Sequence, residues 1–263
     1  MPCDELVVVI PCHRRWDLLP QALAAVAPLP VIVVDDSPPS LDVQPPPGVT
    51  VVATAGSQGF AAAVNVGLAA AQAAGAVRVL LLNDDAAPAA GCVAELAAAW
   101  GPGIGAVGPV ILGPDGAIES AGARLAWWGR ARLLQEVPPG PVEVDALSGA
   151  CVLVSSSERL DEGFAHGFED FALCQSLRRR GQRVVLVPSA VCVHLGGATV
   201  GRRSRRAQRA AVSGHLRLVG RRRLAPVVVA LACAQVIREG GPSERLLGIV
   251  EGVSDWWRSG RGD

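Results

Sequence analysis

The sequence contains no lysine, and no acidic residue occurs between residues 171 and 238. Residues 1–170 carry 7 Arg and 19 acidic residues, whereas residues 171–238 carry 14 Arg. A block this basic requires an anionic neighbour, which could be the protein's own acidic half, a phosphorylated substrate or anionic lipid. Nucleic acid is disfavoured, because the block has no interleaved aromatic residues for base stacking and no duplex-reading motif.

The sequence also lacks an apolar stretch of the length that spans a bilayer, which is about 20 residues. The nearest candidate, residues 224–237, is shorter and follows three arginines. It predicts a packed C-terminal helix, with a helix lying at a membrane surface as the alternative. A peripheral contact of residues 202–237 with an anionic membrane therefore stays a further hypothesis.

Paired cysteines of the CxxC type are absent, and the seven cysteines lie far apart. This spacing excludes a small disulfide-rich domain and suits a reducing compartment. The acidic N-terminus does not match a signal peptide. We therefore expect a cytoplasmic protein, with contact at the inner face of the plasma membrane as the alternative placement.

Strand-like and helix-like segments alternate through the first hundred residues, a pattern typical of a parallel sheet covered by helices. Half of the 263 residues are hydrophobic, enough to bury a full core. The apolar runs predict strands near residues 6–10, 30–35, 49–53, 77–82 and 105–110, and the segments between them predict helices near 16–26, 58–74 and 89–99.

Two of the predicted strands end in paired aspartates, Asp35-Asp36 and Asp84-Asp85. Parallel sheets bind ligands beyond the carboxyl ends of their strands, so both pairs should face one site. Magnesium and manganese ions take one or two carboxylates together with water and substrate phosphates, which makes Asp85 and Asp84 candidate ligands. The alternative is that these aspartates cap turns or helices.

Three other segments carry further candidate residues. The loop at residues 56–60 enters a predicted helix with its amides available to an anion. A broken strand at residues 142–154 contains Gly149, and glycine in a strand often lets a ligand or another backbone approach closely. Glu169-Asp170 begins a helix that ends in arginines and Gly181, which matches the helix dipole, so a helix cap is the alternative to a catalytic role.

Taken in order, these segments resemble the family 2 glycosyltransferases of the GT-A fold, in the branch of bacterial rhamnosyltransferase-like enzymes. The resemblance covers about residues 5–200 and is carried by VVVIP at 7–11, VVDDS at 33–37, GFAAAVNVG at 59–67, LNDD at 82–85, SGA at 148–150, GFED at 167–170 and HLGG at 194–197. It implies an α/β catalytic domain with a mostly parallel central sheet over residues 1–205. The nucleotide-binding half would end near residue 110, the acceptor half would follow, and residues 206–263 would form an Arg-rich helical appendage.

The resemblance also implies an inverting transfer of a hexosyl or deoxyhexosyl group from a nucleoside-diphosphate sugar to a hydroxyl-bearing glycan, lipid-linked or small-molecule acceptor. Asp170 would be the catalytic base, with Glu169 beside it. Asp85, Asp84 and His194 would hold Mn²⁺ or Mg²⁺. The donor would contact residues from every motif before the helix of Glu169: Pro11, Asp35, Asp36, Gly59, Phe60, Asn65, Asn83, Asp84, Gly149 and Ala150.

Two other functions compete with sugar transfer. A nucleotidyltransferase would carry a glycine-rich, basic phosphate loop after the first strand, and residues 11–15 do not supply one convincingly. A non-catalytic sugar-nucleotide-binding module would not need both Asp85 and Asp170. A dehydrogenase is disfavoured further, because no GxGxxG follows the first strand.

Overall fold

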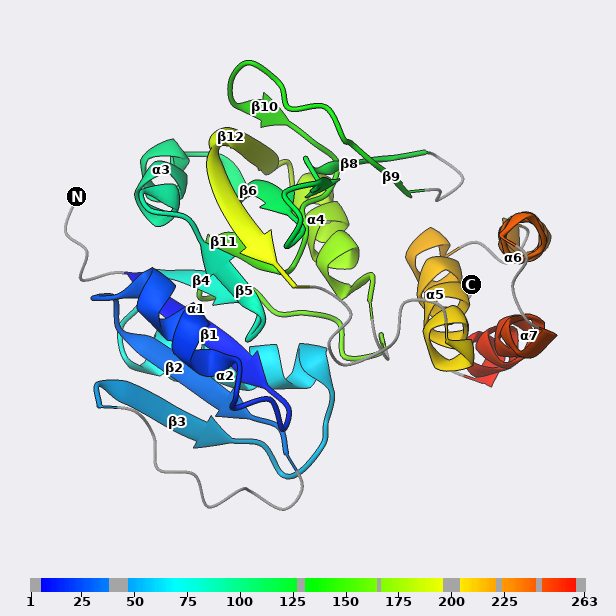
Figure 1. The fold of residues 1–263 in the computed structure, drawn as a ribbon, viewed down its shortest axis with the longest axis horizontal. Helices are drawn as coiled ribbons and strands as arrows, with labels where there is room; N and C mark the ends of the chain where they lie inside the picture. The colour runs from blue at the N-terminus through cyan, green and yellow to red at the C-terminus, as the bar shows by residue number, and fades with distance from the viewer. Residues whose placement is uncertain are drawn as a thin grey trace.

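A ten-stranded sheet forms the centre of the chain (Figure 1). The structure is a computed structural model that describes residues 6–37, 47–126, 131–164, 167–195, 204–220, 224–239 and 243–258. Along the sheet the strand order is β10-β12-β6-β11-β4-β1-β2-β3, while β5 pairs with β12 and β7 pairs with β6.

One side of this sheet is parallel. β1 (Leu6–Cys12) lies between β2 (Val31–Asp35) and β4 (Arg78–Leu82), and β3 (Val49–Ala53) pairs with β2 at the edge. Every residue of β1, β2 and β4 is buried. Burial on both faces explains why these strands read as continuous apolar runs rather than alternating ones.

The other side combines parallel and antiparallel pairs. β11 (Cys151–Ser155) runs antiparallel between β4 and β6 (Ile104–Leu112), and β12 (Arg183–His194) runs parallel to β6. The predicted central sheet flanked by helices is therefore confirmed.

The broken strand at residues 142–154 is two separate strands, because β10 (Val142–Glu143) pairs with β12 instead. The remaining short strands are β5 (Ala86–Pro88), β7 (Ile118–Ser120), β8 (Ala123–Leu125) and β9 (Ala131–Leu133).

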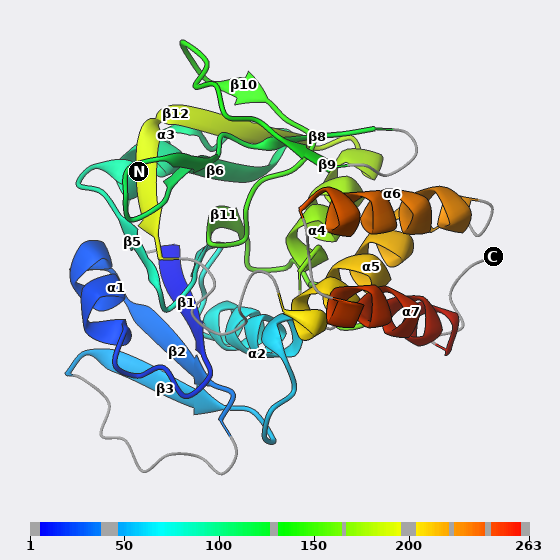
Figure 2. The ribbon, with the colours of Figure 1, turned by 45° about the vertical axis from the view of Figure 1, so that its right-hand side comes forward.

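Helices cover both faces of the sheet, as Figures 1 and 2 show. α1 (Leu19–Val26) and α3 (Cys92–Ala99) pack on the face that receives Val8 and Ile10 of β1. α2 (Phe60–Ala73) and α4 (Glu169–Arg179) pack on the face that receives Val7 and Val9. The three predicted helices of the first hundred residues are present, each beginning two or three residues later than expected.

The C-terminal helices have an apolar cluster of their own. α5 (Arg205–Val219), α6 (Ala225–Arg238) and α7 (Ser243–Arg258) bury Val212, Leu216, Val228, Val236, Ile249 and Trp256 among themselves. A Cβ added at Gly252 of α7 would come within 2.5 Å of the carbonyl oxygen of Arg209, so glycine lets the two helices pack closely. Residues 224–237 thus form a helix packed on one side, while the division of the chain into domains stays a prediction.

In the described part of the chain no helix is long and apolar enough to cross a membrane. Several arginines of the basic block pair with the protein's own acidic residues. Arg178 binds Asp145 at 2.8 Å and Arg217 binds Asp161 at 3.0 Å, while Arg205 and Arg209 pair with acidic residues of α7, Glu251 and Asp255. The protein's acidic half therefore accounts for Arg178 and Arg217, whereas Arg205 and Arg209 pair with acidic residues of the C-terminal segment.

We expect Gly67→Ala to destabilise the protein. A Cβ at Gly67 of α2 would lie 2.9 Å from Cγ2 of Val34 and still closer to Cγ1 of Val9, so the helix could no longer lie flat on the sheet. Overpacking a dense core costs about 1–3 kcal/mol, more than the roughly 1 kcal/mol that alanine gains over glycine in a helix. Urea unfolding measures the change.

Val66→Ala, on the exposed side of the same helix, should stay within about 0.5 kcal/mol of the wild type. An unchanged or raised stability of Gly67→Ala would contradict the close approach.

Candidate functional site

The carboxyl ends of β1, β2 and β4 meet the beginning of β11 at one edge of the sheet. Cys12 lies opposite Asp35, and Leu82 lies opposite Cys151. Because β11 is antiparallel, its first residue rather than its last lies at this edge, and the amide of Asn83 donates to the carbonyl oxygen of Ala150 at 3.0 Å. The motifs at residues 7–11, 33–37 and 82–85 are therefore neighbours of the Ser-Gly-Ala motif at residues 148–150.

Asp36 is buried and holds the loop that precedes α2. Its carboxylate accepts hydrogen bonds from the hydroxyl of Thr54 at 2.7 Å and from the amides of Gln58 and Gly59 at 2.8 and 2.9 Å. The loop amides thus do meet an anion, but in this conformation that anion is Asp36 itself. Donor contacts by Asp36 and Gly59 stay predictions.

Asp35, the neighbouring residue, is also buried at the end of β2. One of its carboxylate oxygens accepts the amide hydrogen of Ser37 at 3.0 Å. The ring of His13 contacts the carbonyl oxygen of Asp36 at 2.8 Å, so residues after β1 and after β2 form one continuous wall. Pro11 lies at the start of this wall, buried in β1.

Asn65 has its side-chain amide occupied within the protein. Its Nδ2 donates to the carbonyl oxygen of Leu160 at 3.0 Å and to Glu162 at 2.8 Å, and its Oδ1 accepts from the amide of Leu160 at 2.8 Å. These bonds fix the chain that leads toward α4. In this conformation Asn65 supports the site rather than lining it, and its contact with the donor stays a prediction.

Asp85 and His194 are in direct contact, as the sequence motifs require if they share a site. Nε2 of His194 lies 3.1 Å from Oδ1 of Asp85, and the amide of Leu195 donates to the carbonyl oxygen of Asp85 at 3.0 Å. Burial lowers the pKa of His194, but Asp85 and then Glu119 more than offset this effect and raise it above its ordinary value. The glycines that follow Leu195 lie outside the described residues.

Asp84 lies beside this pair, and burial followed by the negative charge of Asp85 raises its pKa to about 6. Cys12 and Arg15 act in the opposite direction, so a thiol and a guanidinium lie near the same carboxylate. Asn83, the first residue of the motif, is held close to His194, with Nδ2 3.4 Å from Nε2. Its Oδ1 is buried and has no hydrogen-bond partner.

Glu119 is a site residue that the sequence motifs did not identify. Its Oε2 lies 3.2 Å from Nδ1 of His194, on the side of the ring away from Asp85. It belongs to β7, which lies between the predicted strand at residues 105–110 and the broken strand at residues 142–154. Nothing in the residue pattern there distinguishes it, since its position depends on the pairing of β7 with β6.

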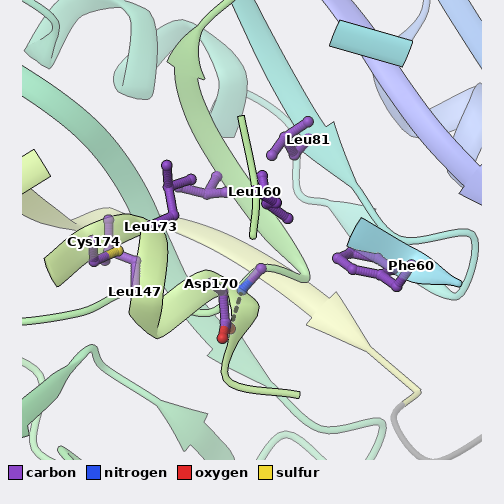
Figure 3. A pocket seen from close by; sticks show the side chains of 9 residues that line it. Phe60, Leu81, Leu147, Leu160, Asp170, Leu173 and Cys174 are labelled. Carbon is purple, nitrogen blue, oxygen red and sulfur yellow. Dashed lines mark hydrogen bonds between the residues drawn. The ribbon is translucent and has the colours of Figure 1, made fainter. Parts of the chain in front are cut away.

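Glu169 and Asp170 are the first two residues of α4, which begins beside the same edge of the sheet. Asp170 accepts the amide hydrogens of Gly149 and Phe171, both at 2.8 Å, and it borders a small apolar pocket with Phe60 (Figure 3). A Cβ at Gly149 would lie 3.1 Å from Cβ of Asp170, so the glycine in the broken strand permits the close approach that its position suggested.

The two carboxyl groups have different surroundings. Burial raises the pKa of Glu169 to about 8, with the negative charge of Asp170 as the second cause, and one oxygen of Glu169 has no hydrogen-bond partner. Burial also raises the pKa of Asp170, but the amides of Gly149 and Phe171 favour its ionised form. Of the two carboxyl groups, Asp170 is thus the one with hydrogen-bond donors that favour an ionised carboxylate.

The chemistry of the Asp85 cluster fits a hard divalent cation. Among the described residues no group of three or more His, Cys, Asp or Glu side chains is arranged to hold a metal ion. However, such ions need only one or two protein carboxylates when water and phosphate oxygens complete the shell. Asp85 and His194 would supply two ligands to such an ion, and the oxygen of Asn83 that has no hydrogen-bond partner would be a third donor.

Comparisons with known proteins bear on this site. Residues 7–136 match the model of the family described as Glycosyl transferase family 2. Two curated proteins named N-acetylglucosaminyl-diphospho-decaprenol L-rhamnosyltransferase, from the CDC 1551 / Oshkosh and H37Rv strains of Mycobacterium tuberculosis, are 28% identical over 227 residues, which cover 72% of this chain and 74% of each relative.

Two solved structures share the fold. GalNAc-T7, determined with UDP, GalNAc and Mn²⁺, matches at a TM-score of 0.59 and 17% identity over 81% of this chain, which spans 47% of that chain's length. The mannosyltransferase PcManGT from Pyrobaculum calidifontis, in complex with GDP-Man and Mn²⁺, matches at a TM-score of 0.58 and 14% identity over 97% of this chain and 87% of that one.

We expect Glu169→Gln to remove a loss of stability that occurs as the pH rises from about 4.5 to about 8. The unfolded chain releases the Glu169 proton near pH 4.5, whereas the folded protein keeps it until about pH 8. Between these values the folded state binds more protons, so the free energy of unfolding falls as the pH rises. At about 1.4 kcal/mol per pKa unit, the variant should exceed the wild type by about 2–4 kcal/mol at pH 8 and match it near pH 4.5.

Urea unfolding at both pH values measures this difference. Glu143→Gln serves as the control, because Glu143 is exposed on β10 and its variant should follow the wild-type pH dependence. Parallel curves for the wild type and Glu169→Gln would show that Glu169 is ionised in the folded protein.

Proposed function

Since the chain belongs to glycosyltransferase family 2, and is a glycosyltransferase that uses a nucleotide-sugar donor, we propose that it carries out an inverting, metal-dependent transfer to a hydroxyl acceptor. The observation that supports this proposal is the meeting of Asp35, Asp85 and His194 with the Gly149–Asp170 contact along one edge of the sheet. Family membership favours sugar transfer over the nucleotidyl transfer that the sequence also allowed.

The donor diphosphate would lie against Asp85, Asp84, Asn83 and His194. This set would hold Mn²⁺ or Mg²⁺ through Asp85 and His194, with the oxygen of Asn83 directed to the ion or its water. A divalent cation bound there would neutralise charge on the leaving nucleoside diphosphate. The base and ribose would lie beyond Asp35, against the wall formed by the ends of β1 and β2.

Asp170 would act as the general base. Two backbone amides and the start of α4 favour its ionised form, while the proton on Glu169 keeps a second negative charge away from it. Asp170 would take the proton of the acceptor hydroxyl as that oxygen attacks the anomeric carbon. With the acceptor as the only nucleophile, one displacement inverts that carbon.

The names of the relatives support a choice of acceptor class. The two mycobacterial proteins are named as rhamnosyltransferases whose acceptor is a sugar on decaprenyl diphosphate. We take a hexosyl or deoxyhexosyl group as the transferred unit and a lipid-linked glycan as the preferred acceptor for this chain. Ala150 and Gly149, between the diphosphate residues and Asp170, would border the transferred sugar.

A lipid-linked acceptor requires the enzyme to reach a membrane, and α6 and α7 offer the surface for it. α6 carries no charged residue before Arg238 and exposes Val227, Leu231 and Ile237, the last at 71%. α7 exposes Val250 at 67% and Trp257 at 64%. Exposed apolar stripes with a tryptophan and flanking arginines are typical of helices that lie on anionic lipid. The free cysteines among the described residues suit the cytoplasmic side of that membrane.

We expect Asp170→Asn to lower turnover by at least about 100-fold, the usual contribution of a general base, and to leave donor binding intact. The donor is first identified as the nucleotide sugar that raises the melting temperature in the presence of Mn²⁺. Transfer to a lipid-linked acceptor and the donor-induced shift in melting temperature are then measured for both proteins.

Asp115→Asn is the matched control, because it makes the same change in an exposed turn and should behave as the wild type. Full turnover by Asp170→Asn would refute the assignment of the base. A wild-type protein that binds the donor but neither transfers the sugar nor hydrolyses the donor would be a binding module.

We also expect Val250→Asp to weaken binding to vesicles that contain phosphatidylglycerol, because it places a charge on the apolar stripe of α7. Co-sedimentation at low salt measures the bound fraction. Val137→Asp, which changes another exposed valine outside the helices, should bind as the wild type does. Equal binding of both variants, or no binding of the wild type, would remove the case for membrane contact.

A further inference from the structure

We propose that Glu119 is a positioning residue for His194, which it orients toward the donor diphosphate and its cation. The inference rests on the proposed function, and it adds a residue that belongs to none of the sequence motifs. Glu119 acts through the imidazole ring of His194, not by touching the substrate.

The ring of His194 is held from both sides. Its Nδ1 lies 3.2 Å from Oε2 of Glu119, and its Nε2 lies 3.1 Å from Oδ1 of Asp85. An ionised carboxylate can only accept a hydrogen bond, so the hydrogen of this contact belongs to Nδ1. The same reasoning puts a hydrogen on Nε2 beside Asp85. A cation bound at Nε2 would replace that hydrogen, while the contact with Glu119 would keep the hydrogen on Nδ1 and the plane of the ring.

The side chain of Glu119 is directed toward His194 by an irregularity in the pairing of β7 with β6. Ile118 lies opposite Leu112 of β6, and Ser120 lies opposite the adjacent residue, Ile111, so the register of the strand pair shifts by one residue at Glu119. An extra residue of this kind bends the strand and redirects a side chain, and such bulges are common beside active sites.

The same end of β6 also carries the strand of His194. Leu112 pairs with Val193 of β12, the residue before His194, and with Ile118 of β7, the residue before Glu119. β6 therefore sets the spacing of the two side chains. Loss of the bulge would return residue 119 to ordinary strand pairing and turn its side chain from the ring.

A carboxylate in this place has a known chemical effect. Histidines that bind metal ions commonly donate their other ring hydrogen to a carboxylate, which orients the ring and makes its free nitrogen more basic, and the loss of that partner usually costs 10- to 100-fold in metal affinity. The side chain of Glu119 is 22% exposed and that of His194 is 18% exposed, so solvent screens this interaction only in part.

The affinity of the full-length protein for Mn²⁺ alone tests the assignment. Electron paramagnetic resonance of free Mn²⁺ gives the dissociation constant without any sugar transfer. Glu119→Leu removes the acceptor and should weaken binding about 10- to 100-fold. Glu119→Gln keeps a neutral acceptor and should fall between Glu119→Leu and the wild type. Glu143→Gln, on a strand that pairs with the other end of β12, should bind as the wild type does.

A spectroscopic signature separates ring orientation from a general loss of structure. Electron spin echo modulation from an imidazole nitrogen bound to Mn²⁺ should be present in the wild type, absent in His194→Ala and reduced in Glu119→Leu, at unchanged melting temperature. Wild-type affinity and modulation in Glu119→Leu would overturn the proposal alone. A wild-type protein that does not bind Mn²⁺ would overturn both the proposal and metal dependence, and transfer measured with EDTA would then decide whether the transferase assignment stands.

Discussion

The antiparallel insertion of β11 between β4 and β6 is the constraint on which the site depends. In a fully parallel sheet the residues before a strand lie at the edge opposite to the ligand. Because β11 runs the other way, Ser148-Gly149-Ala150 lies at the carboxyl edge beside Asn83. Gly149 then brings Asp170 to that edge through a single amide hydrogen bond. The residues proposed to bind the diphosphate and the proposed base thus meet because one strand is reversed.

Negative charge at this edge is balanced in more than one way. Asp36 is neutralised by hydrogen bonds from a loop, Glu169 keeps its proton, and Asp85 pairs with His194. Burial and the negative charge of Asp85 raise the pKa of Asp84. The carboxylates with several hydrogen-bond donors therefore build the site, and a cation beside Asp84 and Asp85 would offset the negative charge that remains there.

The sequence was sufficient for the buried strands and for the edge at which they end, because burial on both faces leaves an uninterrupted apolar run. It was insufficient for roles that depend on tertiary hydrogen bonds. The side-chain oxygen of Asn65 accepts a hydrogen bond from Leu160, which is remote in sequence. Glu119 reaches His194 only because the pairing of β7 is irregular. Residue type and spacing alone show neither contact, because each contact joins residues that only the tertiary fold brings together.

Among the C-terminal helices, α5 contacts the start of α4 in addition to its place in a separate apolar cluster. Phe168, the residue before α4, has a φ of 73°, a left-handed conformation that costs a non-glycine residue about 1–2 kcal/mol. Its ring stacks on His215 of α5 at 5.7 Å, and a Cβ at Gly214 would come within 2.9 Å of that ring. Such strain persists only where neighbouring structure imposes it. Since Phe168 begins the helix of Glu169 and Asp170, α5 helps to hold the proposed base in place, and a disturbance of α5 would be transmitted directly to the turn from which that helix starts.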